Sequence, residues 1–458
     1  MNIKTIILAA GQGTRMRSVK PKVLHKIADR ALLHHVYDTS KQIQNNSIVI
    51  VYGHGGELVK EELQELDADW VEQKQQLGTG HAVQQADKFI NGDDKVLILY
   101  GDVPLLKKTT IDKLLANVSQ NSIGLLTVDL DNPTGYGRIV RAKDGSVLKI
   151  VEEKDSNDKE KLITEGNTGI IAAQGDLLKQ WLSMLENSNA QKEYYLTDII
   201  EMAVNDGIDV KTNHPDTQDE VLGINDRSQL AHLERVFQLQ QAEELMKQGV
   251  TLRDPARIDV RGKFDGIGQD IEIDINVIFE GSNTIGNKVK IGSNCMLKNA
   301  VIGDGVEILA NCIIEDAVVG ERSRIGPFAR LRPQAELASE VHIGNFVEIK
   351  KSTVATGSKI NHLSYIGDTT VGSKVNIGAG TITCNYDGVN KFRTVIEDNA
   401  FIGSDTQLIA PVTVGKGATI GAGSTISKDT PENQLTLSRS KQITINSWQR
   451  PVKKSKFR

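Results

Sequence analysis

The chain has 458 residues, too many for one ordinary hydrophobic core, so we expect at least two domains. Its 54 Lys and Arg against 59 Asp and Glu give a formal net charge of −5. This charge creates no electrostatic field that would attract nucleic acid or anionic membranes. The expected partners are therefore small molecules or further copies of the chain. The three cysteines lack CxxC spacing, which argues against disulfides and a zinc site. The apolar start is too short for a signal peptide and no stretch could span a bilayer, so we expect a cytoplasmic protein without membrane insertion.

Short apolar segments alternate with amphipathic helical patterns over roughly the first half of the chain. Residues 4–8, 47–51, 95–99 and 124–128 are expected to be buried strands. Alternation of this kind predicts an α/β domain around a mainly parallel sheet.

A loop of small residues follows the first expected strand, at the edge where open α/β sheets bind ligands. Gly11 and Gly13 allow backbone N–H groups to approach phosphate oxygens, and Arg15 adds a guanidinium that can hold them. The loop lacks the Gly-Lys-Ser/Thr of a P-loop and the third glycine of a Rossmann fingerprint. Taken alone, it is also compatible with a purely structural turn.

Three further features point to phosphate chemistry. Lys22 lies just after the loop, where its charge could stabilise a phosphoryl transition state. Residues 77–82 form a second glycine-rich turn before a helix. Asp102 follows the strand at 95–99, where Mg²⁺ and phosphates would lie. A lone aspartate there is usually a turn or capping residue, but beside a phosphate loop and a lysine we expect a metal ligand.

A helix is predicted from residue 228 to 248, ended by Gly249, and aliphatic residues then recur every six positions. Three hexads close one triangular coil with aliphatic side chains inside, which predicts a parallel β-helix; a β-sandwich with chance spacing is the alternative. Glycine often follows the aliphatic residue, and we expect it to provide unusual backbone dihedrals at corners. The repeating positions are Ile285, Ile291, Leu297, Val319, Ile325, Leu331, Leu337, Ile343, Ile349, Ile402, Leu408, Val414, Ile420 and Ile426.

The register slips between Ile349 and Ile360 and again between Ile377 and Ile402, and insertions in a solenoid are expected to form loops on a binding face. His362 lies where the register resumes, and a histidine there could remove a proton from an amine. An ordinary surface or core histidine is the alternative. Its neighbours offer cations for a phosphate, hydrogen-bonding groups and a stacking face: Arg332, Lys350, Lys351, Tyr365, Asn376, Asn385 and Tyr386.

The first half of the chain resembles the sugar-phosphate nucleotidyltransferases, whose motif Leu-x-x-Gly-x-Gly-Thr-x-Met followed by Pro-Lys is present at residues 8–16 and 21–22. More narrowly, it is similar to the bacterial bifunctional family that joins an N-acetylglucosamine-1-phosphate uridyltransferase to a glucosamine-1-phosphate N-acetyltransferase. The matching segments are Gln73, Gly78-Thr79, Tyr100-Gly101-Asp102, Gly135-Tyr136-Gly137-Arg138, Val151-Glu152, Asn167-Thr168-Gly169 and Asn225.

That resemblance implies a uridyl transfer in which the sugar phosphate attacks the α-phosphorus of UTP and pyrophosphate leaves. Asp102 and Asn225 would hold one Mg²⁺, while Arg15 and Lys22 would stabilise charge. The residues implied in binding UTP or UDP-N-acetylglucosamine are Leu8, Ala9, Ala10, Gly11, Lys22, Gln73, Gly78, Thr79, Tyr100, Gly101, Asp102 and Asn225, with Gly137, Glu152 and Asn167 at the sugar.

The second half resembles the acetyltransferase domain of the same family, notably over residues 325–333 and 378–388. The resemblance implies that the β-helix is left-handed, that the protein is a homotrimer, and that His362 is the general base for an amine attacking acetyl-CoA. The sugar-phosphate residues would be Arg332, Lys350, Tyr365 and Asn376, and the acetyl-CoA residues Ala379, Asn385, Tyr386, Ser404, Ala422 and Arg439. The basic tail at 450–458 would either close this site or be a solvated end.

The expected organisation is therefore an α/β nucleotidyltransferase (Rossmann-like) domain at 1–228, a linker helix at 229–249 and a left-handed parallel β-helix of hexapeptide repeats at 250–458. The expected product is UDP-N-acetylglucosamine, a precursor of peptidoglycan and other cell-envelope polymers. One alternative is a monofunctional nucleotidyltransferase whose β-helix serves regulation or assembly, as in ADP-glucose pyrophosphorylases. A non-catalytic exchange subunit of a translation factor is another, and the intact Gly-Thr-Arg-Met and Pro-Lys motifs argue against it.

Overall fold

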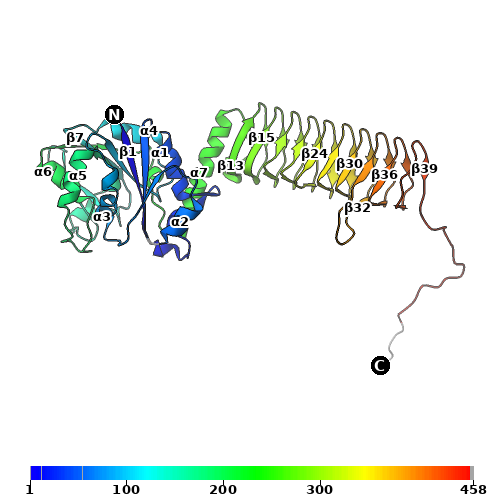
Figure 1. The fold of residues 1–458 in the computed structure, drawn as a ribbon, viewed down its shortest axis with the longest axis horizontal. Coiled ribbons are helices and arrows are strands. Elements are labelled where there is room, and N and C mark those ends of the chain that lie inside the picture. The colour runs from blue at the N-terminus through cyan, green and yellow to red at the C-terminus, as the bar shows by residue number, and fades with distance from the viewer. Residues whose placement is uncertain (1, 12, 54, 454–458) are drawn as a thin grey trace, which may run out of the picture. The chain divides into compact units, whose positions relative to one another are not determined.

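The computed structural model describes residues 2–11, 13–53 and 55–453 of the chain. The chain divides into two compact units, Met1–Gln240 and Gln241–Arg458, which are described separately below (Figure 1). Helix α7 (Arg227–Lys247) contains the division, which falls inside the segment predicted as a linker helix.

The first unit is built on a nine-stranded sheet in the order β11-β7-β10-β6-β1-β4-β5, with a hairpin of β8 and β9 paired to β10. Its strands are β1 (Ile3–Ala9), β4 (Asn46–Tyr52), β5 (Asp69–Glu72), β6 (Lys95–Tyr100), β7 (Ser122–Asp129), β8 (Arg138–Arg141), β9 (Val147–Val151), β10 (Glu165–Gln174) and β11 (Asp209–Asn213), besides a small hairpin of β2 (Lys26–Ile27) and β3 (Arg30–Ala31). The helices are α1 (Leu32–Lys41), α2 (Gly56–Glu62), α3 (Thr79–Gln84), α4 (Lys108–Ala116), α5 (Gly175–Met184) and α6 (Asp198–Asn205).

All four predicted strands are confirmed, but the sheet is more mixed than the alternation predicts. Strand β1 is parallel to β4 and β6, and β11 is parallel to β7, whereas β10 runs antiparallel to both β6 and β7. The chain reaches β10 through the β8–β9 hairpin instead of a helical crossover, and antiparallel strands need no crossover. No pattern in the sequence separated this hairpin from the parallel strands.

Helices cover both faces of this sheet. Because successive side chains of a strand point to opposite faces, Ile7 joins the core that contains residues of α1 and α4, while Ile6 joins the core that contains residues of α3, α5 and α6. Trp181 of α5 is fully buried in the second of these cores. The two-sided burial explains why the central strands read as continuous apolar runs.

Helix α7 matches the helix predicted for residues 228–248. Near its start Leu233 is fully buried in a small core with Met16 and Ile27 of the first unit. Near its end Leu245 belongs to the core of the second unit. Gly249, with φ 94°, ends the helix in the left-handed conformation that glycine adopts most easily.

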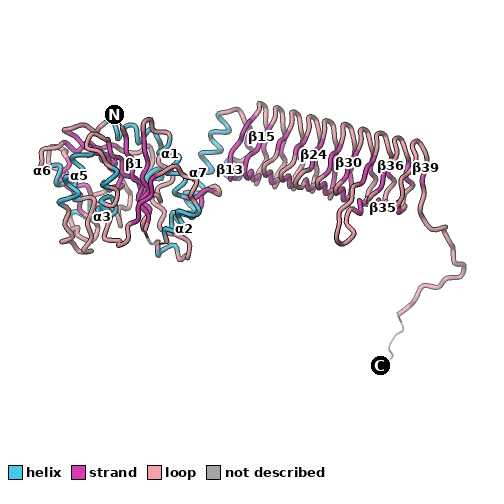
Figure 2. The backbone as a smooth tube through the Cα atoms, viewed as in Figure 1, coloured by secondary structure: helices cyan, strands magenta, loops and turns pink. Residues whose placement is uncertain are grey.

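The second unit is a parallel β-helix, confirming the prediction from the period of six (Figure 2). One eleven-stranded sheet contains β12 (Thr251–Leu252), β14 (Glu272–Ile273), β16 (Lys290–Ile291), β19 (Glu307–Ile308), β22 (Arg324–Ile325), β25 (His342–Asn345), β28 (Lys359–His362), β31 (Asn376–Ile377), β34 (Phe401–Ile402), β37 (Thr419–Ile420) and β39 (Leu435–Thr436). A seventeen-stranded sheet supplies the other sides: β13 (Ile258–Ile267), β15 (Val277–Ile285), β17 (Met296–Lys298), β18 (Val301–Ile302), β20 (Ile313–Glu315), β21 (Val318–Val319), β23 (Arg330–Leu331), β24 (Ala335–Leu337), β26 (Glu348–Lys350), β27 (Ser352–Val354), β29 (Tyr365–Gly367), β30 (Thr369–Val371), β32 (Ile382–Cys384), β33 (Thr394–Ile396), β35 (Gln407–Ile409), β36 (Val412–Val414) and β38 (Thr425–Ile426).

The repeating aliphatic residues form the core of this unit. Every one of the fourteen predicted positions is at most 3% exposed. Burying such a side chain stabilises a fold by about 1.5–3 kcal/mol, so the stacked aliphatic side chains hold successive coils of the β-helix together.

The expected role of glycine after the aliphatic residue is wrong for most coils. Gly303 and Gly320 do not have a positive φ; instead, a Cβ at Gly303 would lie 2.8 Å from the backbone nitrogen of Glu321 in the next coil. Close approach between coils therefore explains these glycines. The left-handed corner conformation falls on other residues, such as Asn311 with φ 63° and Arg322 with φ 55°.

The two register slips differ in kind. Ile343 pairs with Ile360, so the coil containing the first slip is merely one residue shorter than an eighteen-residue coil and forms no loop. Ile377 pairs with Ile402, and the extra residues stand out between β32 and β33 as a loop (Figures 1 and 2). The prediction of an inserted loop is correct for the second slip and wrong for the first.

In the described ranges, no helix has the length and apolar character required to cross a bilayer.

Candidate active sites

The first candidate site lies at the carboxyl ends of β1 and β6. These strands are neighbours, with Leu8 opposite Tyr100, and the N–H of Gly101 donates to the carbonyl of Leu8 at 2.9 Å. The small-residue loop that begins with Ala9, Ala10 and Gly11 therefore starts beside Asp102. This is the sheet edge at which open α/β folds bind ligands.

Four predicted side chains meet at this edge. The Lys22 ammonium forms an ion pair with the Asp102 carboxylate and lies 3.3 Å from Oδ1 of Asn225. Arg15 donates to the same Asn225 oxygen at 2.9 Å. Asp102 and Lys22 are only 14% exposed, so their charges face each other in a partly desolvated setting. The structure thus brings together residues separated by more than 200 positions in sequence.

The oxygen atoms of Asp102 and Asn225 fit a divalent cation. Both face the same ammonium group, so a cation already lies between them in the form of Lys22. Carboxylate and amide oxygens are the ligands that Mg²⁺ prefers, and Mg²⁺ usually takes one or two protein ligands together with substrate phosphates. Over the ranges that the structure describes, no cluster of three or more His, Cys, Asp or Glu side chains offers a competing metal site.

Gln73 and Gly78, which are predicted to hold the uridine nucleotide, lie together and form a uridine wall. Gln73 is 3% exposed, and its amide nitrogen lies 3.1 Å from the Gly78 carbonyl and 3.1 Å from Nδ1 of His81. A Cβ at Gly78 would lie 2.6 Å from the Tyr194 carbonyl, so only glycine fits there, with φ 108°. The side chain of Gln73 and the turn at Gly78 are consequently fixed relative to each other.

The three predicted sugar residues, Gly137, Glu152 and Asn167, form a second group, the sugar wall. A Cβ placed on Gly137 would lie 3.0 Å from Cγ2 of Ile150, 3.5 Å from Oε2 of Glu152 and 3.6 Å from Cβ of Asn167. The N–H of Asn167 also donates to the Gly137 carbonyl at 2.8 Å. The absence of a side chain at Gly137 therefore lets its backbone lie close to a carboxylate and an amide.

Sequence reasoning missed the segment that connects these two walls. Tyr194 exchanges backbone hydrogen bonds with Leu77 and Gly80, each 2.8 Å long, and Thr197 donates to Oε1 of Glu152 at 3.0 Å. The segment Tyr194-Tyr195-Leu196-Thr197-Asp198 leads into helix α6, which begins at Asp198. The available signal was this dense run of polar and aromatic residues at a helix start.

Several acidic groups in this site are hard to ionise. Desolvation raises the pKa of Glu152, and the neighbouring carboxylates Asp155 and Glu193 raise it further, although the Thr197 hydrogen bond opposes them. Desolvation, followed by Glu152 and Glu201, raises the pKa of Asp198 to about 6. Desolvation and the charge of Glu152 also raise the pKa of the Tyr100 hydroxyl.

We predict that Asp198→Asn stabilises the protein at neutral and alkaline pH. A carboxyl group whose folded-state pKa is raised from 3.8 to about 6 stabilises the fold while protonated, and this contribution is lost as pH rises through that interval. Asparagine carries no charge to desolvate, so the melting temperature at about pH 8 should rise by about 2–4 °C. This corresponds to roughly 1 kcal/mol in the free energy of unfolding, after allowance for the partial exposure of the side chain. At about pH 4.5 the difference in melting temperature should be much smaller. Equal shifts at both pH values would contradict the carboxylate origin of the effect.

The second candidate site lies on the β-helix. Arg332 and Lys350 occupy equivalent positions on adjacent coils, and the Arg332 N–H donates to the carbonyl of Ile349 at 2.9 Å. On the following coil Gly367 takes this position, and the Tyr365 ring lies over it, since a Cβ there would be 2.4 Å from the tyrosine oxygen. Arg332 and Lys350 therefore share one ladder, and the Tyr365 ring covers its next position.

The inserted loop adds a cation that sequence reasoning missed. Lys391 is the largest influence lowering the pKa of Lys350, followed by desolvation and Arg332. Glu348 balances one of these charges through an ion pair of 2.7 Å with Arg332, which raises the pKa of Arg332. Arg332, Lys350 and Lys391 thus place three cations together, a group that suits a phosphate, while Glu315 and Asp368 act on them more weakly. Lys351 instead lies 3.6 Å from Asp368, outside this group.

His362 starts a second ladder that runs along one edge of the β-helix. The strand registers place His362 opposite Asn345, and the same position on the following coils is occupied by Ala379, Ser404 and Ala422. Adjacent strands of a sheet lie about 4.8 Å apart, so this row presents His362 at one end and small residues beyond it. Arg439 donates to the Ala422 carbonyl at 3.0 Å. The predicted base and four predicted acetyl-CoA residues are thus contiguous.

The remaining predicted residues lie around these ladders. Asn385 begins the inserted loop and donates to Asp368 at 2.5 Å, whereas Tyr386 is 59% exposed and bonds the Gly388 carbonyl within the loop. Asn376 lies in β31, in the eleven-stranded sheet, and is not brought into contact with Arg332 or Lys350. Of the basic tail, residues 450–453 are exposed, and 454–458 lie outside the described residues.

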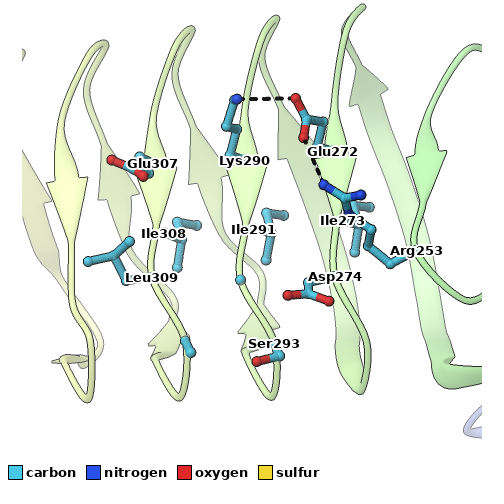
Figure 3. Close-up of a pocket in the computed structure, with 12 residues that line it drawn as sticks. Arg253, Glu272, Ile273, Asp274, Lys290, Ile291, Ser293, Glu307, Ile308 and Leu309 are labelled. Atoms are coloured by element: carbon cyan, nitrogen blue, oxygen red, sulfur yellow. Dashed lines mark ion pairs between the residues drawn. The ribbon is translucent and has the colours of Figure 1, made fainter.

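A separate hollow of about 310 Å³ on the first coils contains none of the predicted residues. Figure 3 shows Glu272 between Lys290 and Arg253, with ion-pair distances of 3.2 and 3.8 Å. These charges are exposed and compensate one another, so the hollow has the character of an ordinary polar surface.

Comparison with protein families supports both halves of this description. A family model for the MobA-like NTP transferase domain matches residues 5–154. A model for the GMPPB C-terminal domain matches residues 266–341, and one for bacterial transferase hexapeptide repeats matches residues 393–428. The fold class is therefore the expected one, an α/β nucleotidyltransferase domain followed by a left-handed β-helix of hexapeptide repeats.

Curated relatives match the chain from end to end. The bifunctional protein GlmU of Methylococcus capsulatus is 60% identical over 456 residues, covering 100% of this chain and 99% of that protein. The proteins of the same name from Azoarcus sp. and Ralstonia nicotianae are each 56% identical, covering 98% and 100% of this chain and 100% of each relative.

Proposed function

This chain belongs to the GlmU family of bifunctional enzymes, and we propose that its two candidate sites perform the two transfers of that family with the residues described above. The enzyme makes UDP-N-acetylglucosamine: it transfers acetyl from acetyl-CoA to glucosamine-1-phosphate, then uridyl from UTP to N-acetylglucosamine-1-phosphate. A monofunctional nucleotidyltransferase with a regulatory β-helix is not favoured, because the bifunctional relatives match over the whole chain.

The observation that carries the proposal is the separate gathering of two predicted residue sets. Arg15, Lys22, Asp102 and Asn225 meet at the sheet edge of the first unit, while His362 heads a ladder beside a cation group in the second. Each set has the chemistry that one of the two reactions requires. A substitution in one residue set should therefore abolish one activity and leave the other intact.

For uridyl transfer we assign positioning and charge stabilisation to the first site. Gln73 and the turn at Gly78 would hold uridine, and the wall of Gly137, Glu152 and Asn167 would hold the sugar. The attacking sugar phosphate already carries its charge, so the site needs no activated protein nucleophile. Arg15 and Lys22 would stabilise the charge that develops at the α-phosphorus.

Asp102 and Asn225 are proposed to hold one Mg²⁺. Bound there, the ion would neutralise phosphate charge and orient the pyrophosphate leaving group. Lys22, which contacts both residues, would then turn to the phosphates.

For acetyl transfer we assign the general base to His362. It would take a proton from the amine of glucosamine-1-phosphate as that nitrogen attacks the thioester carbonyl, forming the amide bond and breaking the carbon–sulfur bond. Arg332 and Lys350 would bind the phosphate, with Tyr365 and Asn376 at the sugar. Ala379, Ser404, Ala422 and Arg439 would line the acetyl-CoA channel, with Asn385 and Tyr386 near the reacting group.

We propose that the enzyme is a cytoplasmic homotrimer. Its co-substrates UTP and acetyl-CoA are cytoplasmic metabolites, and hexapeptide β-helices leave flat flanks that suit side-by-side packing. Light scattering should therefore give a molar mass of three times the 50.1 kDa chain, and a monomer mass at working concentration would contradict the assembly.

The function is tested by incubating the purified protein with glucosamine-1-phosphate, acetyl-CoA, UTP and Mg²⁺. UDP-N-acetylglucosamine, pyrophosphate and free CoA thiol should appear in equal amounts. Formation of CoA thiol without UDP-N-acetylglucosamine would contradict the proposed uridyl transfer. Absence of CoA thiol would contradict the proposed acetyl transfer.

A further inference from the structure

Arg138 is a nearly buried cation immediately behind the proposed sugar wall. It begins β8 and is 2% exposed. Its Nη2 lies 2.7 Å from the Glu153 carboxylate, and its Nη1 donates to the carbonyl of Tyr136. Burying a guanidinium is costly unless partners satisfy it, so its location calls for an explanation.

The two partners of Arg138 flank two proposed sugar residues. Tyr136 precedes Gly137, and Glu153 follows Glu152. Arg138 also pairs with Val151 across the β8–β9 hairpin, so Gly137 and Glu152 leave the hairpin at the same end. The guanidinium therefore joins the two chain segments just where they separate to form the wall.

Two contacts hold the wall from its outer sides, and the backbone of Gly135 acts on the Glu153 carboxylate together with Arg138. Asn167 bonds the Gly137 carbonyl at 2.8 Å, and Thr197 bonds Glu152 at 3.0 Å. Neither contact connects Gly137 to Glu152. The Arg138 guanidinium also holds the pKa of Glu153 below its ordinary value, so this carboxylate stays charged in the pair.

We propose that Arg138 is a positioning residue for the sugar phosphate in uridyl transfer, setting the separation of Gly137 and Glu152 through the Tyr136 carbonyl and Glu153. This inference rests on the proposed function. Its consequence is selective: none of the hydrogen bonds of Gln73 or Arg138 joins the two residues, so nucleotide binding should change far less than sugar-phosphate binding.

The test compares Arg138→Met, Arg138→Lys and Glu153→Gln with the matched control Arg141→Met. Arg141 lies on the same strand and has its own ion pair with Glu165 at 2.6 Å, away from Gly137. We expect the KM for N-acetylglucosamine-1-phosphate to rise about tenfold in Arg138→Met and less in the Lys and Gln variants, with the KM for UTP within about twofold of wild type. Acetyl transfer and melting temperature report on folding in the same samples.

Several outcomes would overturn the inference: an equal rise in both KM values, a fall in kcat alone, or the same effect in Arg141→Met. Should Arg138→Met fail to fold, Glu153→Gln decides, because Glu153 is 31% exposed and its replacement keeps the shape. A wild-type enzyme that does not use N-acetylglucosamine-1-phosphate at all would instead refute the proposed function.

Discussion

Replacing His362 with alanine should abolish most acetyl transfer while uridyl transfer proceeds at the wild-type rate. A positioned general base contributes about 10²–10⁴-fold to a rate, and His362 is the only predicted base on its ladder, where small residues follow it. The side chain is exposed, so its removal leaves no cavity in the core of the β-helix. Release of CoA thiol and formation of pyrophosphate, measured on the same preparation, report the two activities separately.

His342→Ala is the matched control for this experiment. His342 lies in the same sheet one coil earlier, outside the ladder that contains His362. It should retain both activities. Equal loss of acetyl and uridyl transfer in His362→Ala would contradict the assignment of the two reactions to two units, and full retention of acetyl transfer would refute the role of His362.

The β-helix was predictable because its determinants are local and repeated. Each coil buries an aliphatic side chain at every sixth position, as Ile343 and Leu408 illustrate. The pattern can therefore be recognised in the sequence of any coil. The sequence could not distinguish a shortened coil from an inserted loop, because both appear only as a lost register. Pairing of Ile343 with Ile360, against Ile377 with Ile402, separates the two cases.

The parts of the sites that escaped prediction depend on contacts between distant segments. Lys391 acts on Lys350 only because the loop after β32 brings the two side chains together. Thr197 reaches Glu152 across 45 positions, and nothing in a run of five residues before a helix indicates that contact. Motifs at strand ends, such as Asp102, were predictable because the carboxyl ends of neighbouring parallel strands lie at the same edge of the sheet.

The glycines of the β-helix show how a correct pattern can have a different cause. Gly320 was expected to relieve a strained dihedral, yet a Cβ there would lie 2.5 Å from the carbonyl carbon of Ala338. Substitution by alanine would thus push two coils apart. Distances between coils are a property of stacking, which a single repeat does not contain.

Asp102→Asn should reduce uridyl transfer by about 10²–10³-fold, equivalent to about 3–4 kcal/mol, and leave acetyl transfer unchanged. The change keeps the size of the side chain but removes the charge that faces Lys22. A neutral amide binds Mg²⁺ less well, so the Mg²⁺ concentration that gives half-maximal rate should rise as well, and excess Mg²⁺ should restore part of the activity.

Asp112→Asn provides the comparison, because Asp112 is also paired with a lysine, Lys108, but on the exposed face of α4. It should change neither the rate nor the Mg²⁺ requirement. A slow Asp102→Asn enzyme with an unaltered Mg²⁺ requirement would mean that the carboxylate acts by orienting Lys22, whereas a slow enzyme with a raised requirement identifies it as the ligand. Because Lys22 contacts Asp102 and Asn225 alike, Asn225→Ala should raise the Mg²⁺ requirement in the same direction only in the second case.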